Sequence, residues 1–174
     1  MLGIFCVLSV GAGGCGYSLA GRGSFLPAHI QTIGVPTFVN RTPVFNLETQ
    51  LTQKVRSEFI GRGKYKIVPE SENVDAILVG AVVSVVPAPA NFDPISQLAT
   101  RFVLTMNASV ELRDVKENKV LWQNPALFFR QEYDVESGPN SLDPAAFFAQ
   151  DANAFDRMTT DFARTIVSAI LEAF

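Results

Sequence analysis

The chain has 174 residues, of which 48% are hydrophobic and 18% charged, a balance typical of a folded globular protein. Its net charge of -3 argues against a protein that coats nucleic acid, which needs a basic surface. One histidine and two cysteines, of which Cys6 lies in an apolar leader, argue against a structural zinc site and an intramolecular disulfide.

The leader is the most specific feature at the start of the chain. Residues 1–14 are apolar and uncharged, and Cys15 follows three small residues at 12–14. Small residues are typical of a signal-peptidase cleavage point. We expect residues 1–14 to be a lipoprotein signal peptide and Cys15 to become the acylated first residue. An ordinary secretory leader and a buried N-terminal strand are the alternatives. The run is shorter than the roughly 20 apolar residues of a membrane span, so lipid would be the anchor.

The next segments suggest a tether followed by a strand and a helix. Residues 15–30 are expected to form a lipidated tether, and residues 31–174 a single α/β domain. A strand is expected over 31–39, with Pro36 at an edge or a bulge because proline cannot donate to a ladder. A helix is expected from about 45 to 60, because apolar side chains recur there every four residues: Leu47, Leu51, Val55 and Phe59.

Four further strands are expected before the last helix. Residues 65–68 form a short one, and the apolar, β-branched residues 76–86 form a central one. A proline-rich loop should occupy 87–100. In residues 101–114 apolar and polar side chains alternate, with Val103 as the exception, which predicts one face on a core and one in a polar environment. Residues 120–133 should return antiparallel, with an irregularity at 124–125.

A long amphipathic helix is expected from about 144 to 173, with Pro144 in its first turn and Asp143 as its N-cap. The order is β-α-β-β-β-β-α, or β-α-β-β-β-α if the third and fourth strands are one bent strand. Two amphipathic helices on one face of a sheet predict an α+β fold. The specific form is a two-layer α/β sandwich with a mixed four- to five-stranded sheet.

No catalytic constellation is recognisable in the sequence. His29, beside Pro27 and Ala28, is expected to be a loop residue rather than a general base. The glycines at 61 and 63 follow a helix instead of opening one, so they do not match a phosphate-binding loop. We therefore expect a protein that is not an enzyme and has no catalytic residue, no metal site and no cofactor.

Three stretches together resemble the LPS-assembly lipoprotein family (LptE), the lipoprotein subunit of the outer-membrane lipopolysaccharide translocon. They are residues 15–19, residues 33–62 and the alternating strand 102–112. The resemblance implies a lipid-anchored protein on the periplasmic side of the cell outer membrane. It also implies a large β-barrel translocon partner, whose lumen the protein plugs and whose assembly it supports, and it implies lipopolysaccharide as a ligand. A polar barrel lumen would suit the polar face of strand 101–114.

The basic residues through which the family is thought to bind lipopolysaccharide do not carry over, because residues 74–100 and 131–156 contain no Lys or Arg. The nearest substitutes are Arg101, Lys116, Lys119 and Arg130. Solvated strand-end charges are the alternative interpretation of all four. If they do bind, the double substitution R101E with K119E should weaken lipopolysaccharide binding.

A second hypothesis is a periplasmic scaffold or activator lipoprotein of a cell-wall synthase or a secretion pore, because the start of the domain at 33–38 also resembles such proteins. An envelope hydrolase is a third. The protein that co-purifies from detergent-solubilised outer membranes, a β-barrel or a synthase, separates the first two.

Overall fold

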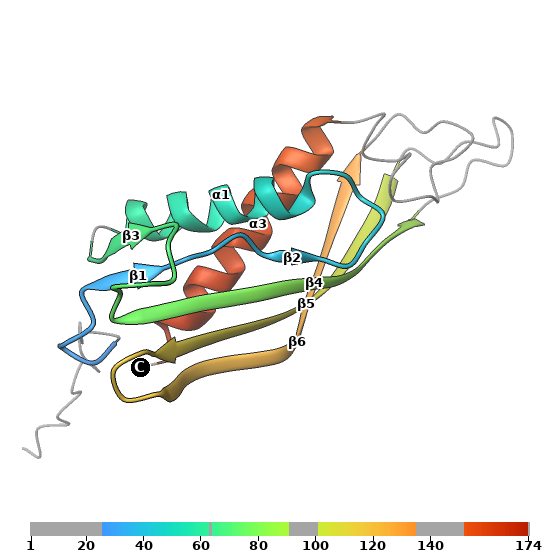
Figure 1. Ribbon diagram of the computed structural model, residues 1–174. Coiled ribbons are helices and arrows are strands. Elements are labelled where there is room, and N and C mark those ends of the chain that lie inside the picture. Colours follow the sequence, from blue (N-terminus) through green and yellow to red (C-terminus); the bar gives the residue numbers. More distant parts are fainter. Residues whose placement is uncertain (1–25, 63, 91–100, 135–151, 174) are drawn as a thin grey trace, which may run out of the picture.

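The computed structural model describes residues 26–62, 64–90, 101–134 and 152–173 of the chain. Among these residues the predicted α+β class is confirmed, because two helices pack on one face of a mixed sheet (Figure 1). The sheet that these residues form has six strands rather than the four to five expected. The elements in chain order are β1 (Thr32–Gly34), β2 (Val39–Asn40), α1 (Leu47–Gly61), β3 (Lys66–Val68), β4 (Ala76–Pro89), β5 (Arg101–Asp114), β6 (Lys119–Asp134) and α3 (Ala152–Leu171).

The sheet order is β3-β1-β4-β5-β6, and β2 pairs with β4 further along the same edge. β1 is parallel to β3 and β4, and β2 is parallel to β4, whereas β4, β5 and β6 form an antiparallel meander. The single strand expected over 31–39 is wrong, because the segment divides into β1 and β2 around Pro36. The carbonyl of Val35 accepts both Nε and Nη2 of Arg56, at 2.9 and 2.6 Å, instead of continuing a ladder.

The core lies between the helices and the inner face of the meander. The α1 stripe predicted from its four-residue spacing is fully buried, as are four of the five predicted α3 stripe residues, Met158, Phe162, Ile166 and Ile170. The rings of Phe162 and Phe129 meet edge to face with centroids 5.4 Å apart, which fixes α3 against β6. The inward residues of β5 are buried in the same cluster, so the predicted alternation of this strand holds.

The central strand continues to Pro89, so the break expected at Pro87 is wrong. Beyond Val82, β5 is the partner of β4 among the described strands. The Ala90 N–H donates to the Arg101 carbonyl at 2.8 Å. Bonded and non-bonded positions alternate along an antiparallel pair, so the nitrogens of both prolines lie on the open edge, where no donor is needed.

The described fold begins before the first strand. Leu26 and Ile30, within the segment expected to be a tether, are 2% and 4% exposed and belong to the hydrophobic core. Cys15, the expected signal peptide, Asp143 and Pro144 lie outside the described residues. In the described part of the chain, the helices fall short of the length and apolarity that a membrane crossing demands.

Candidate functional site

The described helices leave the outer face of the meander uncovered (Figure 1). Because strand residues alternate between faces, the polar side chains of β5 point away from the helices, and Thr105, Asn107, Ser109 and Glu111 all remain partly exposed. Asn107 donates to the Ser84 hydroxyl of β4 at 3.0 Å across this face. We call the outward-pointing residues of β2, β4, β5 and β6 the open face.

The open face also carries exposed apolar side chains beside the polar β5 row. They lie on β2, β4 and β6 and comprise Val39, Val79, Val83, Val86 and Phe128, each between 43% and 58% exposed. Val83 is the extra residue of a bulge in β4, opposite the step from Ala108 to Asn107 in β5. A surface that combines an apolar flank with a row of polar groups is typical of a protein-contact surface rather than a catalytic one.

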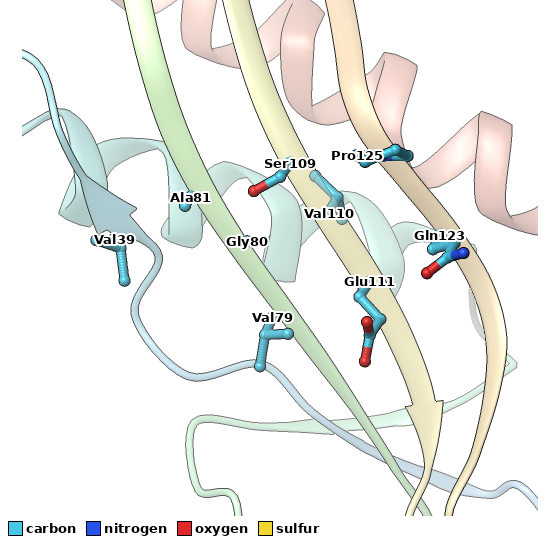
Figure 2. A pocket seen from close by; sticks show the side chains of 9 residues that line it. All are labelled: Val39, Val79, Gly80, Ala81, Ser109, Val110, Glu111, Gln123 and Pro125. Carbon is cyan, nitrogen blue, oxygen red and sulfur yellow. The ribbon is translucent and has the colours of Figure 1, made fainter.

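A depression of about 330 Å³ lies on this face, across β2, β4, β5 and β6 (Figure 2). Val39 and Val79 line one side, Ser109 and Glu111 the middle, and Gln123 with Pro125 of β6 the other side. The register explains the arrangement, because Val79, Glu111 and Gln123 are direct neighbours across three strands. The hollow is open and mostly apolar, so it can accept a protruding side chain of a partner.

Gly80 forms part of this depression, and the packing of Phe38 explains why this residue is a glycine. A Cβ atom there would lie 2.6 Å from the ring of Phe38, a distance that real contacts do not allow. Phe38 is buried, and its backbone N–H donates to the Thr52 hydroxyl of α1 at 3.0 Å. The missing side chain therefore lets an aromatic ring pack directly against the sheet.

The cations proposed from the sequence are not brought together. Arg101 is at the start of β5 and pairs with Asp134 at 2.9 Å, whereas Lys116 and Lys119 lie at the hairpin after its end. A 14-residue strand spans about 43 Å at ~3.3 Å per residue, so one headgroup cannot contact both ends. Arg130 is exposed in β6, opposite Thr105.

A polar cluster that sequence reasoning missed lies where the chain enters the fold. His29 Nε2 is 2.6 Å from Oδ2 of Asp114, which is fully buried, and the Glu117 N–H donates to Oδ1 at 2.9 Å. That backbone bond, ahead of the contact with His29, lowers the pKa of the Asp114 carboxyl against the opposing effect of burial. Nearby, the Asp75 carboxylate accepts the Thr32 and Gln31 N–H groups, which lower its pKa.

Ligand atoms of His29, Asp114 and Glu117 lie within 4.8 Å of one another, close enough for a metal ion. Both oxygens of Asp114 already accept hydrogen bonds from the protein, so we interpret the cluster as a clasp between the N-terminal segment and the β5–β6 hairpin. No local sequence signal could have revealed it, because the two members of the pair are 85 residues apart.

The chain is similar to one family of known proteins. A family model described as "LptE: Lipopolysaccharide-assembly" matches residues 30–170. No curated protein is significantly similar to the chain in sequence.

Solved structures share the fold at low sequence identity. Rare lipoprotein B from Shewanella oneidensis is 14% identical with a TM-score of 0.50, over 82% of this chain and 95% of that one. The hypothetical protein CT253 from Chlamydia trachomatis is 9% identical with a TM-score of 0.52, over 83% of this chain and 99% of that one. At these identities the likeness establishes a common fold.

Proposed function

The chain belongs to the LptE family of lipopolysaccharide assembly, and on that basis we propose a specific role for it. It is an outer-membrane lipoprotein, held on the periplasmic side by lipid on Cys15. It plugs a large β-barrel translocon, supports the assembly of that barrel and assists the insertion of lipopolysaccharide at the cell surface. The role requires binding surfaces and no reaction chemistry.

One observation carries the proposal: the open face is polar along β5 and apolar on its flanks, and no described helix covers it. The lumen of a large barrel is polar, so a matching surface needs hydrogen-bonding groups such as Asn107 and Ser109 rather than a continuous apolar patch. The apolar hollow beside Val79 would receive a side chain from the barrel wall and provide the buried centre that stable interfaces use.

The anchor is compatible with this placement. Eleven residue steps separate Cys15 from Leu26, where the described fold begins, and an extended chain covers about 3.5 Å per residue. The folded domain could therefore stand up to roughly 38 Å from the membrane that holds the lipid.

The four cations Arg101, Lys116, Lys119 and Arg130 remain proposed contacts for the phosphates of lipopolysaccharide. Their separation divides them into two groups, Arg101 with Arg130 on one part of the meander and the two lysines at the hairpin. One headgroup could therefore contact one of the two groups but not both.

Co-purification from detergent-solubilised outer membranes tests the proposal. The lipidated protein should bring down a β-barrel of translocon size. V79R should reduce the recovered barrel severalfold, because it fills the hollow with a charged side chain. V115R is the matched control, since Val115 has the same 43% exposure on the hairpin turn. Wild-type protein that recovers a cell-wall synthase and no barrel, or equal recovery by both variants, would contradict the proposal.

A further inference from the structure

Phe45 is the most exposed large apolar side chain of the described residues, at 92% exposure. It lies in the connection from β2 to α1, which we call the Arg41–Phe45 loop. Its neighbour Val44 is 2% exposed, so the loop buries one apolar side chain and displays the next. A fully displayed phenylalanine leaves a large apolar surface in water, and this cost is recovered when a ligand covers the ring.

The loop is held in one conformation by Asn40, which uses its whole side chain. Asn40 Nδ2 donates to the Val44 carbonyl at 2.7 Å and to Glu48 Oε2 at 2.9 Å. Its Oδ1 accepts the backbone N–H and the hydroxyl of Thr42, at 2.9 and 2.8 Å. A preorganised loop loses little conformational entropy on binding, so Phe45 is displayed in a form suited to contact.

Arg41 supplies a positive charge at the start of the same loop. It is exposed, and none of the ion pairs among the described residues includes it, whereas Arg101, Arg113 and Arg62 each pair with a carboxylate. A guanidinium without a carboxylate partner can bind a phosphate with two parallel hydrogen bonds.

The loop begins at the edge of the sheet, directly after β2. The Arg41 N–H donates to the Val82 carbonyl at 2.9 Å, at the point where β4 loses its neighbour β2. From there the chain leaves the edge of the sheet and enters α1, in the helical layer (Figure 1).

We propose that the Arg41–Phe45 loop is a lipopolysaccharide contact, with Arg41 on a phosphate and the Phe45 ring among acyl chains. The inference rests on the proposed function for the identity of the lipid. An unpaired cation four residues from an exposed aromatic ring matches a ligand whose phosphates adjoin its hydrocarbon. A protein partner would need a carboxylate and an apolar pocket at the same spacing, so it is a separate outcome of the test.

Site-specific photocrosslinking of the complex purified with its barrel tests the contact directly. A benzoylphenylalanine in place of Phe45 should crosslink to lipopolysaccharide. The same probe in place of Phe128, which is 58% exposed on the open face, should crosslink to the barrel. A barrel adduct, or no adduct, at position 45 would overturn the inference. Loss of the barrel from the wild-type preparation would instead overturn the proposed function.

Titration with fluorescent lipopolysaccharide supplies an independent measurement. R41E should weaken binding about tenfold, as loss of a charge-assisted hydrogen bond predicts. F45A should weaken it severalfold with an unchanged melting temperature, since the ring touches little of the protein. K66E makes the same charge change on an exposed residue of β3 and should bind like wild type. Wild-type affinity in both loop variants, or an equal loss in K66E, would overturn the inference.

Discussion

The imidazole Nε2 of His29 lies 2.6 Å from Oδ2 of Asp114, a fully buried carboxylate 85 residues further along the chain. This pair connects the N-terminal segment to the hairpin between β5 and β6. The lowered pKa of Asp114, which reflects the bond from the Glu117 N–H first, shows that the folded protein favours the charged form. On our proposal the lipid is attached to Cys15, earlier in the chain, so the clasp holds the segment that follows the anchor against the domain.

The first prediction concerns the pH dependence of stability. A carboxyl whose pKa is lowered by folding contributes stability above its unfolded pKa of about 3.9, and this stability is lost as the pH falls through the folded value. D114N should therefore reduce the free energy of unfolding by about 1.5–3 kcal/mol at pH 7. The difference from wild type should shrink in acid below the folded pKa. Urea unfolding of D114N and wild type, at pH 7 and in acid, measures this difference.

D134N is the control for this experiment, because Asp134 forms an exposed pair with Arg101. Such pairs contribute about 0–1 kcal/mol, so its unfolding curve should stay close to wild type. If D114N were destabilised equally at pH 7 and in strong acid, the charged form of Asp114 would not be the source of the stability.

The second prediction concerns Gly80. G80A should destabilise the protein by about 1–3 kcal/mol, because the new Cβ would meet the Phe38 ring at 2.6 Å and displace a buried aromatic side chain. G61A has open space around its Cβ at the end of α1 and should be neutral or slightly stabilising. Thermal unfolding of both variants checks the contrast, and equal melting temperatures would show that Phe38 can move at no cost.

The third prediction concerns the cations at the two ends of β5. R101E and K119E should affect lipopolysaccharide binding independently, because residues far apart without shared partners act additively to within about 0.5 kcal/mol. The fold-loss of affinity in the double variant should equal the product of the fold-losses in the two single variants. A double-mutant cycle measures this, and strong coupling would mean that one headgroup bridges both positions. Wild-type affinity in the double variant would remove both residues from the proposed contacts.

Local patterns predicted the fold well where one face of an element is buried. The spacing of Leu47, Leu51 and Val55 predicted α1, and the alternation in 101–114 predicted β5 over the same residues that form it in the structure. Proline was the main source of error. Pro36 divides the first strand, whereas Pro87 and Pro89 lie inside β4, and the difference depends on which edge of the sheet needs a donor.

Less of the candidate site could be predicted, because its parts come from distant segments. The polar side of β5 was apparent from the sequence, but its apolar flank on β4 and β6 depends on the register between strands. Asn40 is a second example. That its side chain would fix the display of Phe45 depends on where α1 begins, because Glu48 in its first turn is one of the partners.

The fourth prediction concerns the anchor. C15S should abolish acylation, so mass analysis of the mature amino end should find diacylglycerol on the wild type and none on the variant. When it is expressed without the barrel partner, the variant should leave the membrane fraction, because the acyl chains, at roughly 0.8 kcal/mol per buried CH₂, are then its anchor. A wild-type amino end without lipid would contradict the proposed attachment and leave the fold unaffected.

The fifth prediction separates loop order from direct contact. Asn40 does not belong to the proposed lipid contact, yet its substitution should weaken binding, because it fixes the Arg41–Phe45 loop. N40A loses all four side-chain hydrogen bonds and should cost about 1–3 kcal/mol of stability as well as lipid affinity. N40D retains the acceptor for Thr42 but places a carboxylate against Glu48, so it should be at least as destabilising.

Crosslinking distinguishes the two causes in the same variants. With benzoylphenylalanine at position 45, an N40A background should still give a lipid adduct, in lower yield, because the aromatic probe is present and only its orientation is lost. R41E should lower the yield without lowering the melting temperature, because Arg41 has no ion pair among the described residues to lose. If N40A bound lipopolysaccharide like wild type while unfolding more readily, Asn40 would stabilise the start of α1 and have no part in recognition.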